Sequence, residues 1–149
     1  KPGFLTLDFG AKYMGYCSDM TRTVVVGNAD SEMKALYDTV LRAQMSALDF
    51  ITEGVRCADA DRVAREITER DYPSLFSHSL GHGVGRRIHE SPRLSSRAGD
   101  KRLSCGHVVT VEPGIYIEGK YGCRIEDMLV IGEGCAHNIT RSSKELIVL

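Results

Sequence analysis

The sequence predicts an α+β fold, because β-prone segments precede and follow a pair of amphipathic helices. Residues 4–27 are rich in β-branched and apolar residues around a turn at residues 12–15, which predicts a hairpin or meander. Apolar residues then recur at three- and four-residue steps from Met33 to Ile51 and again from Ala60 to Ile67. Residues 108–117 and 123–131 return to the strand pattern around a glycine-containing turn, and they predict a second hairpin.

Capping residues mark where the helices begin and end. Asp30 and Ser31 can cap the first helix, and Gly54 lies just past its end, where a left-handed C-cap is expected. The second helix is predicted over about residues 58–70, because Pro73 cannot continue it. Three further segments are predicted from composition: a strand and turn over 77–89, a polar basic loop over 91–102, and a short strand over 145–148 that could close a sheet edge.

Length and composition indicate one ordinary globular domain. The chain has 149 residues, 42% apolar and 26% charged, with a net charge of −1, so charge gives no reason to expect nucleic acid or an anionic membrane as a partner. No apolar run is long enough to span a bilayer, and no signal peptide is visible. The five cysteines are odd in number and lack CxxC spacing, which favours reduced thiols in a cytoplasmic protein. Since the chain begins Lys1-Pro2-Gly3, we expect it to be a piece of a longer protein.

Two pairs of carboxylates lie on the predicted hairpins. Asp8 and Asp19 are on either side of the first turn, and Glu112 and Glu126 are on either side of the second, so antiparallel pairing can bring each pair together. Asp8 and Glu112 follow apolar runs, which predicts that both are buried. Buried carboxylates repel one another unless a positive charge lies between them, and a metal is the simplest such charge. Spacing alone also allows the simpler interpretation of four surface or salt-bridged carboxylates near strand ends.

A glycine-rich segment supplies the histidine that a metal site would need. His82 lies in Gly-His-Gly-Val-Gly, where the glycines allow close approach of the backbone, and His78 and His89 lie nearby. His107 and His137 have no such context and are interpreted as ordinary surface residues. The chain contains no GxSxG, phosphate-loop or HExxH motif, and no cysteine has a nucleophile motif around it.

These segments together resemble the creatinase/aminopeptidase family, whose fold is called pita-bread. Residues 7–23 resemble its first metal hairpin, residues 81–92 its histidine segment, and residues 110–116 with 124–127 its glutamate hairpin. The variant resembles the Xaa-Pro aminopeptidase and prolidase branch, although Cys123 stands where valine is more usual. The resemblance implies an antiparallel curved sheet with helices on its outer face.

The resemblance also implies a role for each ligand. Asp8 would chelate one metal, and Asp19 and Glu126 would bridge both. His82 and Glu112 would hold the second metal, and Glu112 would also handle the proton of a bridging water. The implied cofactors are two divalent metal ions, with Mn²⁺ favoured because oxygen-rich ligation suits it, and Co²⁺ or Zn²⁺ as alternatives.

Three residues outside the metal shell receive roles in the same way. His78 and His89 would contact the substrate carbonyl and the tetrahedral oxyanion, and Arg124 would support the carboxylates. The implied reaction is hydrolysis of Xaa-Pro bonds by a metal-generated hydroxide, with Glu112 passing the proton to the leaving nitrogen. The implied partners are peptides with proline at the second position, and neither nucleic acid nor membrane. We expect the full-length protein to be a cytoplasmic homodimer.

Two alternatives remain open at the sequence level. The chain could be a pita-bread binding module without catalysis, or a methionine aminopeptidase or creatinase-like hydrolase. It also departs from the family pattern, because it starts almost on the first strand, where family members carry a further helical segment and often an N-terminal domain. Residues 1–149 are therefore expected to be a partial catalytic domain that is weakly active or inactive.

Overall fold

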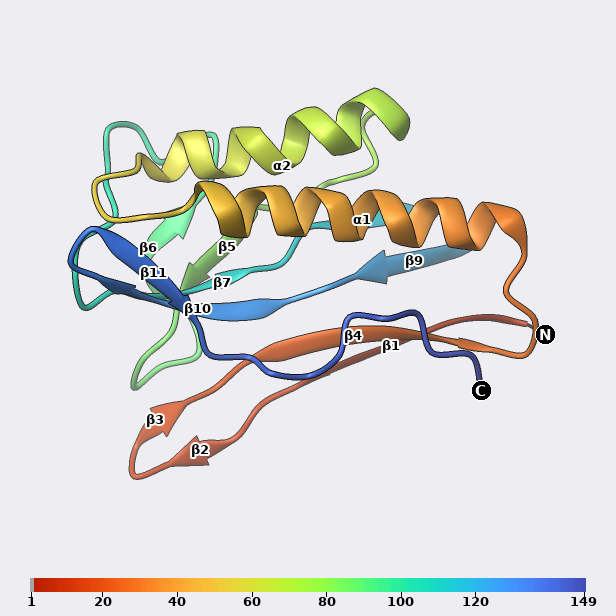
Figure 1. Ribbon diagram of the computed structural model, residues 1–149, viewed down its shortest axis with the longest axis horizontal. Coiled ribbons are helices and arrows are strands. Elements are labelled where there is room, and N and C mark those ends of the chain that lie inside the picture. The colour runs from red at the N-terminus through yellow and green to blue at the C-terminus, as the bar shows by residue number, and fades with distance from the viewer. Residues whose placement is uncertain (1) are drawn as a thin grey trace.

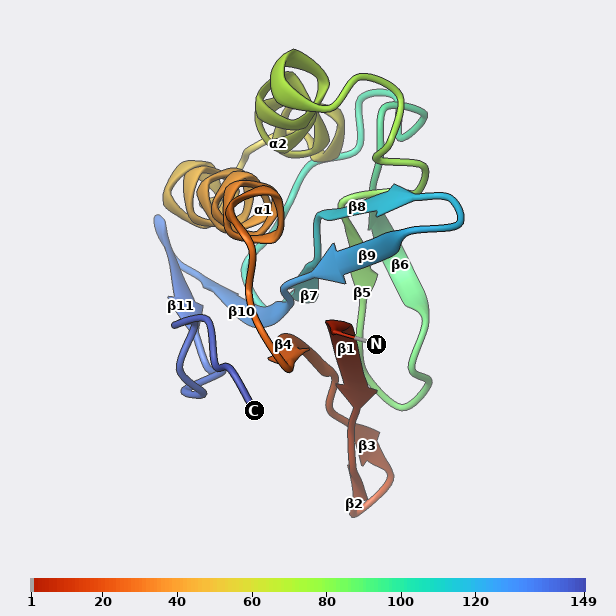
Figure 2. The same ribbon diagram turned by 90° about the vertical axis from the view of Figure 1, so that its right-hand side faces the viewer.

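The computed structural model describes residues 2–149 and shows two helices lying on one face of antiparallel strands (Figure 1). The helices are α1 (Ser31–Phe50) and α2 (Cys57–Asp71), and they run side by side above the strands (Figure 2). Small residues let them approach closely: Ala43 and Ala47 of α1 and Ala60 and Ala64 of α2 are completely buried in one core. The sheet contributes Val109, Val111, Leu129 and Ile131 to the same core. The predicted α+β class is therefore confirmed.

The first hairpin forms as predicted. Strand β1 (Gly3–Phe9) pairs antiparallel with β4 (Met20–Val26), and the short strands β2 (Lys12–Tyr13) and β3 (Tyr16–Cys17) extend it around the turn. The turn contains Met14 at φ 49° and Gly15 at φ 86°. Gly15 supplies the left-handed conformation without a side-chain clash.

A five-stranded sheet carries the histidine segment and most of the second hairpin. Its strand order is β11-β10-β7-β5-β6, and every paired neighbour is antiparallel. The bounds are β5 (Gly81–Gly83), β6 (Glu90–Leu94), β7 (Val108–Val111), β10 (Asp127–Gly132) and β11 (Cys135–Asn138). Two of these strands were not expected: β6 occupies the start of the segment predicted to be a loop, and β11 was not predicted.

The second hairpin is interrupted in both strands. Strands β8 (Gly114–Ile117) and β9 (Tyr121–Arg124) form its outer part, and β7 with β10 form its inner part. The register is the same on both sides of the interruption, because Asp127 pairs with Val111 and Arg124 pairs with Gly114. The breaks therefore place residues 112–113 opposite residues 125–126.

Helix α1 begins where it was predicted to begin. The Asp30 carboxylate accepts a hydrogen bond from the backbone N–H of Met33 at 2.7 Å, which caps the helix. The end differs from the prediction, because the helix stops at Phe50 with Ile51 as its extended C-cap. Gly54 does have the predicted positive φ, 83°, but in the following turn.

The end of the chain lies along β4. The backbone N–H of Val25 donates to the carbonyl of Ile147 at 2.9 Å, and Val25 forms a parallel bridge with Val148. This confirms that the terminal residues close a sheet edge, although they form an isolated bridge rather than a full strand.

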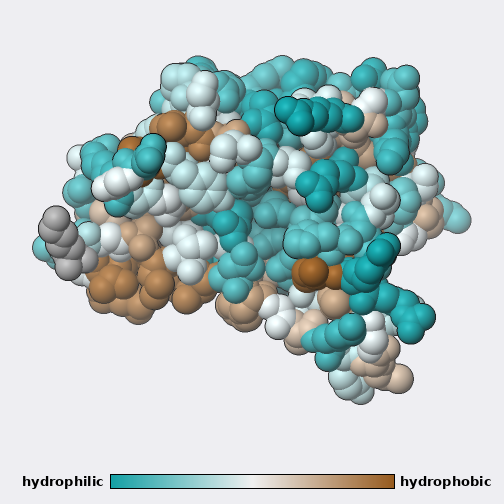
Figure 3. Space-filling view, turned by 180° about the vertical axis from the view of Figure 1, so that it is seen from behind, coloured by the Kyte–Doolittle hydropathy of each residue, from teal (hydrophilic) through white to brown (hydrophobic). Residues whose placement is uncertain are grey.

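One side of β1 is apolar and exposed. Leu5, Leu7 and Phe9 alternate along the strand and are 40–57% exposed, and hydrophobic surface gathers near the beginning of β1 in Figure 3. The opposite side of β1 turns inward, where the ring of Phe4 meets those of Tyr37 and Tyr121. Neither helix has the length and apolar character that crossing a membrane would require.

Candidate metal centre

The first hairpin brings both of its aspartates to one end of β4. Asp8 is the register partner of Thr21, and Asp19 directly precedes β4, so the two carboxylates are diagonal neighbours. The prediction that Asp8 is buried was wrong. Its side chain is 53% exposed, because β1 pairs only with β4 and has no strand on its other side. The Asp8 carboxylate forms a short ion pair with Arg124 of β9.

The interruption of the second hairpin holds both glutamates. Glu112 follows β7 and Glu126 precedes β10, so the unchanged register places them opposite one another at the break. Glu126 is 2% exposed, and its Oε2 accepts a hydrogen bond from Thr21 at 2.6 Å. Glu112 is mostly buried, and its Oε1 accepts from Thr110 at 2.9 Å. At the break the two residues pair with other segments: the Glu126 backbone N–H donates to the Thr21 carbonyl oxygen of β4 at 3.1 Å, and that of Glu112 donates to the Leu80 carbonyl oxygen at 2.8 Å.

The histidine is supplied by β5. The buried His82 sits between Gly81 and Gly83, and a Cβ at Gly81 would come within 1.9 Å of the Thr110 carbonyl oxygen of β7. Glycine therefore lets β5 approach β7 closely. The His82 backbone N–H donates to Thr110 Oγ1 at 3.0 Å, and His82 Nδ1 is 3.0 Å from the Gly83 carbonyl oxygen. A proton on Nδ1 leaves Nε2 directed at the carboxylates.

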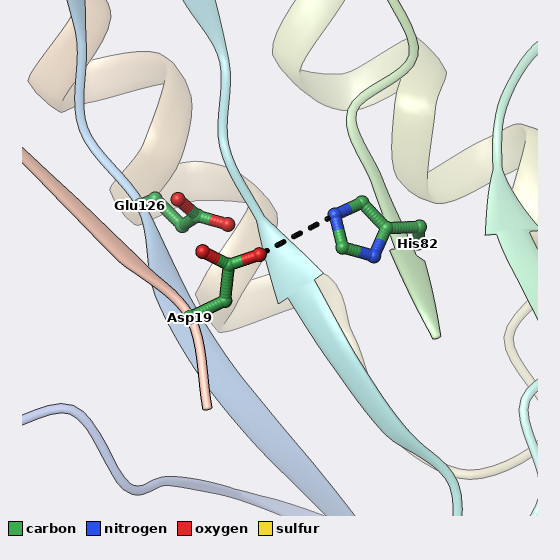
Figure 4. A group of neighbouring side chains, drawn as sticks. All are labelled: Asp19, His82 and Glu126. Carbon is green, nitrogen blue, oxygen red and sulfur yellow. Dashed lines mark ion pairs between the residues drawn. The ribbon is translucent and has the colours of Figure 1, made fainter. Parts of the chain in front are cut away.

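Three elements thus converge on one point. Ligand atoms of Asp19, His82 and Glu126 all lie within 4.8 Å of one another (Figure 4). His82 Nε2 is 3.7 Å from Asp19 Oδ2 and 3.1 Å from Glu112 Oε1, so Glu112 adjoins the same cluster. The structure brings four of the five predicted ligands together and places the fifth, Asp8, beside them on Arg124.

The carboxylates of the cluster shift one another's pKa values. Burial, and then the charge of Glu112, raise the pKa of Glu126 to about 8. Burial and the charge of Asp8 raise the pKa of Asp19. Burial would lower the pKa of His82, but its contacts with Glu112 and Gly83 outweigh burial and raise it. Burial acts to raise the pKa of Glu112, but hydrogen bonds from His82 and Thr110 lower it overall. The site therefore concentrates negative charge that needs a positive counter-charge.

The donor set suits one or two divalent cations. Glu126 Oε1 is buried and lacks a hydrogen-bond partner among the described residues, so an oxygen lone pair is available within the cluster. The donors are carboxylate oxygens and one imidazole nitrogen, the combination that Mn²⁺ and related ions accept. The cysteines are all free, and none belongs to the cluster.

A chain of hydrogen bonds surrounds the cluster. Arg124 Nη1 donates to the Tyr116 hydroxyl oxygen at 3.0 Å, and that hydroxyl is 2.9 Å from His78 Nε2. Because the oxygen accepts from Arg124, its own proton is free to be donated to His78, whose Nδ1 then donates to the Ser79 carbonyl oxygen at 2.9 Å. Burial lowers the pKa of His78, which agrees with this neutral form.

The other expected residues also lie near the cluster. His89 is exposed, and its ring centre is 4.3 Å from that of His82. Arg124 Nε donates to Thr21 Oγ1 at 3.3 Å, and Thr21 in turn donates to Glu126. His107 and His137 lie outside the cluster.

Sequence reasoning missed Thr21, Thr110 and Tyr116. Thr21 lies two residues after Asp19, and Thr110 lies two residues before Glu112. In an extended chain, residues two apart lie on the same face. This period of two was the available signal for both threonines. Tyr116 had no comparable signal, because its contact with His78 joins residues 38 apart in the sequence.

A basic cavity of about 560 Å³ opens beside His78. Its lining includes three arginines and, among the described residues, no carboxylate: Arg65, Ser77, His78, Ser79, Arg93, Ser95, Ser96 and Arg97. Arg93 is the register partner of His82 on the edge strand β6, so the cavity adjoins the histidine segment.

Comparison with known proteins gives consistent matches along the chain. The sequence profile described as "Metallopeptidase family M24" matches residues 1–133. The uncharacterised peptidase YqhT of Bacillus subtilis is 49% identical over 146 residues, covering 97% of this chain and 41% of that protein. The Xaa-Pro dipeptidase of Pyrococcus furiosus is 44% identical over 144 residues, covering 96% of this chain and 41% of that protein. The solved Xaa-Pro dipeptidase from Bacillus anthracis superposes with a TM-score of 0.94 at 48% identity, covering 98% and 41% of the respective chains. The chain thus spans about 41% of the length of these relatives.

Proposed function

The chain belongs to metallopeptidase family M24, and we propose that it forms the metal-binding catalytic part of an Xaa-Pro peptidase. Its fold is the pita-bread fold that the sequence resemblance implied. The observation that carries the proposal is the meeting of Asp19, His82 and Glu126 within 4.8 Å, with Glu112 3.1 Å from His82. These residues come from separate segments of the chain, and together they form a dense set of hard-metal ligands.

Five residues would hold the cofactor: Asp8, Asp19, His82, Glu112 and Glu126. Ligand atoms of Asp19, His82 and Glu126 already lie within 4.8 Å of one another, so these three residues would form the core of the ligand set. When bound, the ions would supply a nucleophile from water at neutral pH and polarise the scissile carbonyl. Asp8 would join after its carboxylate turns from Arg124, an adjustment that its exposure permits.

The surrounding side chains would handle protons and the substrate. Glu112 would take the proton of the attacking water and deliver it to the leaving nitrogen. The lowered pKa of Glu112 keeps its carboxylate ionised and able to accept that proton. Burial would keep His78 neutral by lowering its pKa, and its Nε2 would remain 2.9 Å from the Tyr116 hydroxyl. We propose that His78 and His89 contact the substrate carbonyl and the oxyanion that forms from it.

The basic cavity supports a preference for dipeptides. In an Xaa-Pro dipeptide the free carboxylate lies on the residue directly after the scissile bond. Arg93 and Arg97 line the cavity that also contains His78, and they can receive that carboxylate. The name Xaa-Pro dipeptidase carried by several relatives agrees with this preference.

Comparing Xaa-Pro with its C-terminal amide tests the dipeptide preference. Removing the carboxylate should lower kcat/KM by about tenfold or more, the scale of a charge-assisted hydrogen bond. In the Arg93→Met variant, kcat/KM for the Xaa-Pro dipeptide should fall close to that for its C-terminal amide. Equal turnover of acid and amide by the unaltered chain would contradict the preference but leave the peptidase proposal standing.

Metal content and Xaa-Pro hydrolysis, measured on the same Mn²⁺-loaded sample, test the proposed function. We expect about two Mn²⁺ per chain and measurable hydrolysis. Glu112→Gln should lower kcat by about 10²–10⁴-fold, because it removes the group proposed to move the proton. Glu118→Gln, on the exposed turn of the same hairpin, is the matched control and should leave both measurements unchanged.

Three outcomes separate the proposal from its alternatives. A folded chain that binds no Mn²⁺ would contradict the metal centre. Metal binding with hydrolysis of methionyl peptides or creatine, and none of Xaa-Pro, would indicate one of the sister enzymes. Metal binding without hydrolysis of any of them would agree with the weak activity expected of a chain that spans about 41% of its relatives. The binding-module alternative would be favoured if the full-length protein bound metal and were inactive as well.

A further inference from the structure

An ion pair on α2 holds the segment that leads into β5. Asp61 and Arg65 are one helical turn apart, and they meet through two hydrogen bonds, from Arg65 Nε to Asp61 Oδ2 at 2.9 Å and from Nη2 to Oδ1 at 3.0 Å. The Asp61 side chain is completely buried and that of Arg65 is 27% exposed. Neither residue was singled out from the sequence, where the apolar pattern of this helix runs from Ala60 to Ile67. The structure buries Asp61 and Thr68 more completely than Ile67.

This pair takes the place of a neighbouring strand along residues 76–80. Arg65 Nη1 donates to the Phe76 carbonyl oxygen at 2.7 Å, and Nη2 donates to the His78 carbonyl oxygen at 2.8 Å. The Leu80 backbone N–H donates to Asp61 Oδ1 at 3.0 Å. Phe76, His78 and Leu80 alternate, so their backbone groups face the same side, as they would in a strand. The guanidinium also lies 4.3 Å from the Phe76 ring centre.

The segment held in this way carries His78. On its other side, the ring of His78 reaches the Tyr116 hydroxyl at 2.9 Å and packs edge-on against Phe76, with ring centres 5.0 Å apart. Residues 77–80 belong to no strand, and backbone hydrogen bonds from the second hairpin reach this segment at its two ends, from Tyr116 N–H to the Leu75 carbonyl oxygen at 3.1 Å and from Glu112 N–H to the Leu80 carbonyl oxygen at 2.8 Å. Between those two ends, the hydrogen bonds from Arg65 of α2 hold the backbone carbonyls of Phe76 and His78 itself.

We propose that Asp61 and Arg65 are positioning residues for His78. They contact neither the candidate metal ligands nor the reacting groups, and they act by fixing the backbone of residues 76–80. Four of the five guanidinium N–H groups of Arg65 are already used within the fold, which leaves little of this side chain for a substrate. The inference rests on the proposed function, because His78 matters to catalysis only if the site cleaves peptides.

Arg65→Lys is the main test, and the same helix supplies a matched control. Lysine keeps the charge, but it cannot bind Asp61 through two hydrogen bonds and reach two carbonyls as well. Arg62 forms a similar i,i+4 pair with Glu66 on the exposed side of α2, with Nη1 2.8 Å from Glu66 Oε1. Arg62→Lys therefore makes the same chemical change without touching residues 76–80. Asp61→Asn is the second variant. Its amide oxygen can still accept the hydrogen bond from the Leu80 N–H, but the loss of the negative charge and of one acceptor oxygen weakens the interaction with Arg65.

Two readouts are measured on folded protein: kcat on the Mn²⁺-loaded form, and the histidine NMR spectra on the diamagnetic metal-free form. The ring nitrogen shifts of His78, followed by NMR, report its tautomer and its contact with Tyr116. We expect these shifts to change in Arg65→Lys and Asp61→Asn and to remain unchanged in Arg62→Lys. We expect kcat for Xaa-Pro to fall by about 10–100-fold in Arg65→Lys at unchanged metal content.

The outcomes separate this inference from the proposed function. If Arg65→Lys only lowers the unfolding midpoint, while the His78 shifts and kcat of the folded protein match those of Arg62→Lys, the positioning role is refuted. Loss of metal with unchanged His78 shifts would also refute it. If neither this chain nor the full-length protein hydrolyses Xaa-Pro but the His78 shifts still move in Arg65→Lys, the positioning stands and the proposed function fails.

Discussion

At the scale of single residues, Glu126 is a buried carboxylate whose ionisation is costly without a positive charge beside it. One carboxylate oxygen accepts from Thr21, and the other lacks a partner among the described residues. The pKa of Glu126 rises from 4.5 to about 8, which corresponds to at most about 5 kcal/mol. Because the folded chain holds this proton more tightly than the unfolded chain, the metal-free protein should lose stability as the pH rises from about 4.5 to about 8.

Glu126→Gln should remove this loss. Glutamine keeps the shape and cannot ionise, so in chelator-treated protein the variant should be more stable than the unaltered chain at about pH 9 and similar to it at about pH 5. Urea unfolding at both pH values measures the difference. Glu118→Gln, on the exposed turn, should follow the unaltered chain at both values. A Glu126→Gln variant that is no more stable at high pH would show that the carboxylate is not destabilised by burial.

At the scale of secondary-structure elements, the close approach of β5 and β7 builds the site. Gly81 permits it, because any Cβ there would lie 1.9 Å from the Thr110 carbonyl oxygen and 3.0 Å from Thr110 Oγ1. That hydroxyl accepts from the His82 backbone and donates to Glu112, so it links two candidate ligands. Moving β5 away from β7 would separate His82 from Glu112.

Gly81→Ala should therefore affect both stability and metal binding. We expect a loss of about 1–3 kcal/mol in unfolding free energy, the usual cost of overpacking, together with weaker Mn²⁺ binding by titration calorimetry. Gly3→Ala is the control, because a Cβ at Gly3 meets no atom within 4 Å. If Gly81→Ala bound Mn²⁺ as tightly as Gly3→Ala, the spacing of β5 and β7 would not control the site.

The elements also show what the sequence could and could not predict. The two hairpins, both helices and the glycine-flanked His82 follow from local patterns, namely periodicity, capping and turn residues. Strand β6 could not be predicted in this way, because the segment is polar and basic and becomes a strand only by pairing with β5 at the sheet edge. The sequence carries no local signal for the burial of Asp61, because that burial depends on Arg65 and on a segment about twenty residues further along the chain.

Within the site, too, some features follow from local sequence patterns and others depend on segments that are distant in the sequence. The identity of the candidate ligands could be inferred from motifs, and four of them meet in space. The burial of Asp8 was predicted wrongly, because an apolar run before a carboxylate does not show whether another element covers it. Its exposure and its pairing with Arg124 depend on the arrangement of β1 and β9, which lie far apart in sequence.

At the scale of the whole molecule, the candidate centre joins parts of the chain that are otherwise held by separate sheets. Asp19 belongs to the β1–β4 hairpin, His82 to the five-stranded sheet, and Glu126 to the break between β9 and β10. Within the described residues, one backbone connection between the first hairpin and the second is the isolated antiparallel bridge of Thr21 with Glu126. A cation bound at this junction would link the hairpin to the sheet.

Metal binding should accordingly stabilise the whole fold. A ligand that binds only the folded state at about 100 times its Kd adds about 2.7 kcal/mol, which for a domain of this size raises Tm by about 5–10 °C. Mn²⁺ should produce this shift in a thermal unfolding experiment, and His82→Ala should abolish it. His137→Ala removes an exposed histidine of the same sheet and should retain the full shift. If Mn²⁺ raised the Tm of the His82→Ala variant as much as that of the control, the ion would be binding elsewhere, and the junction would not be the metal centre.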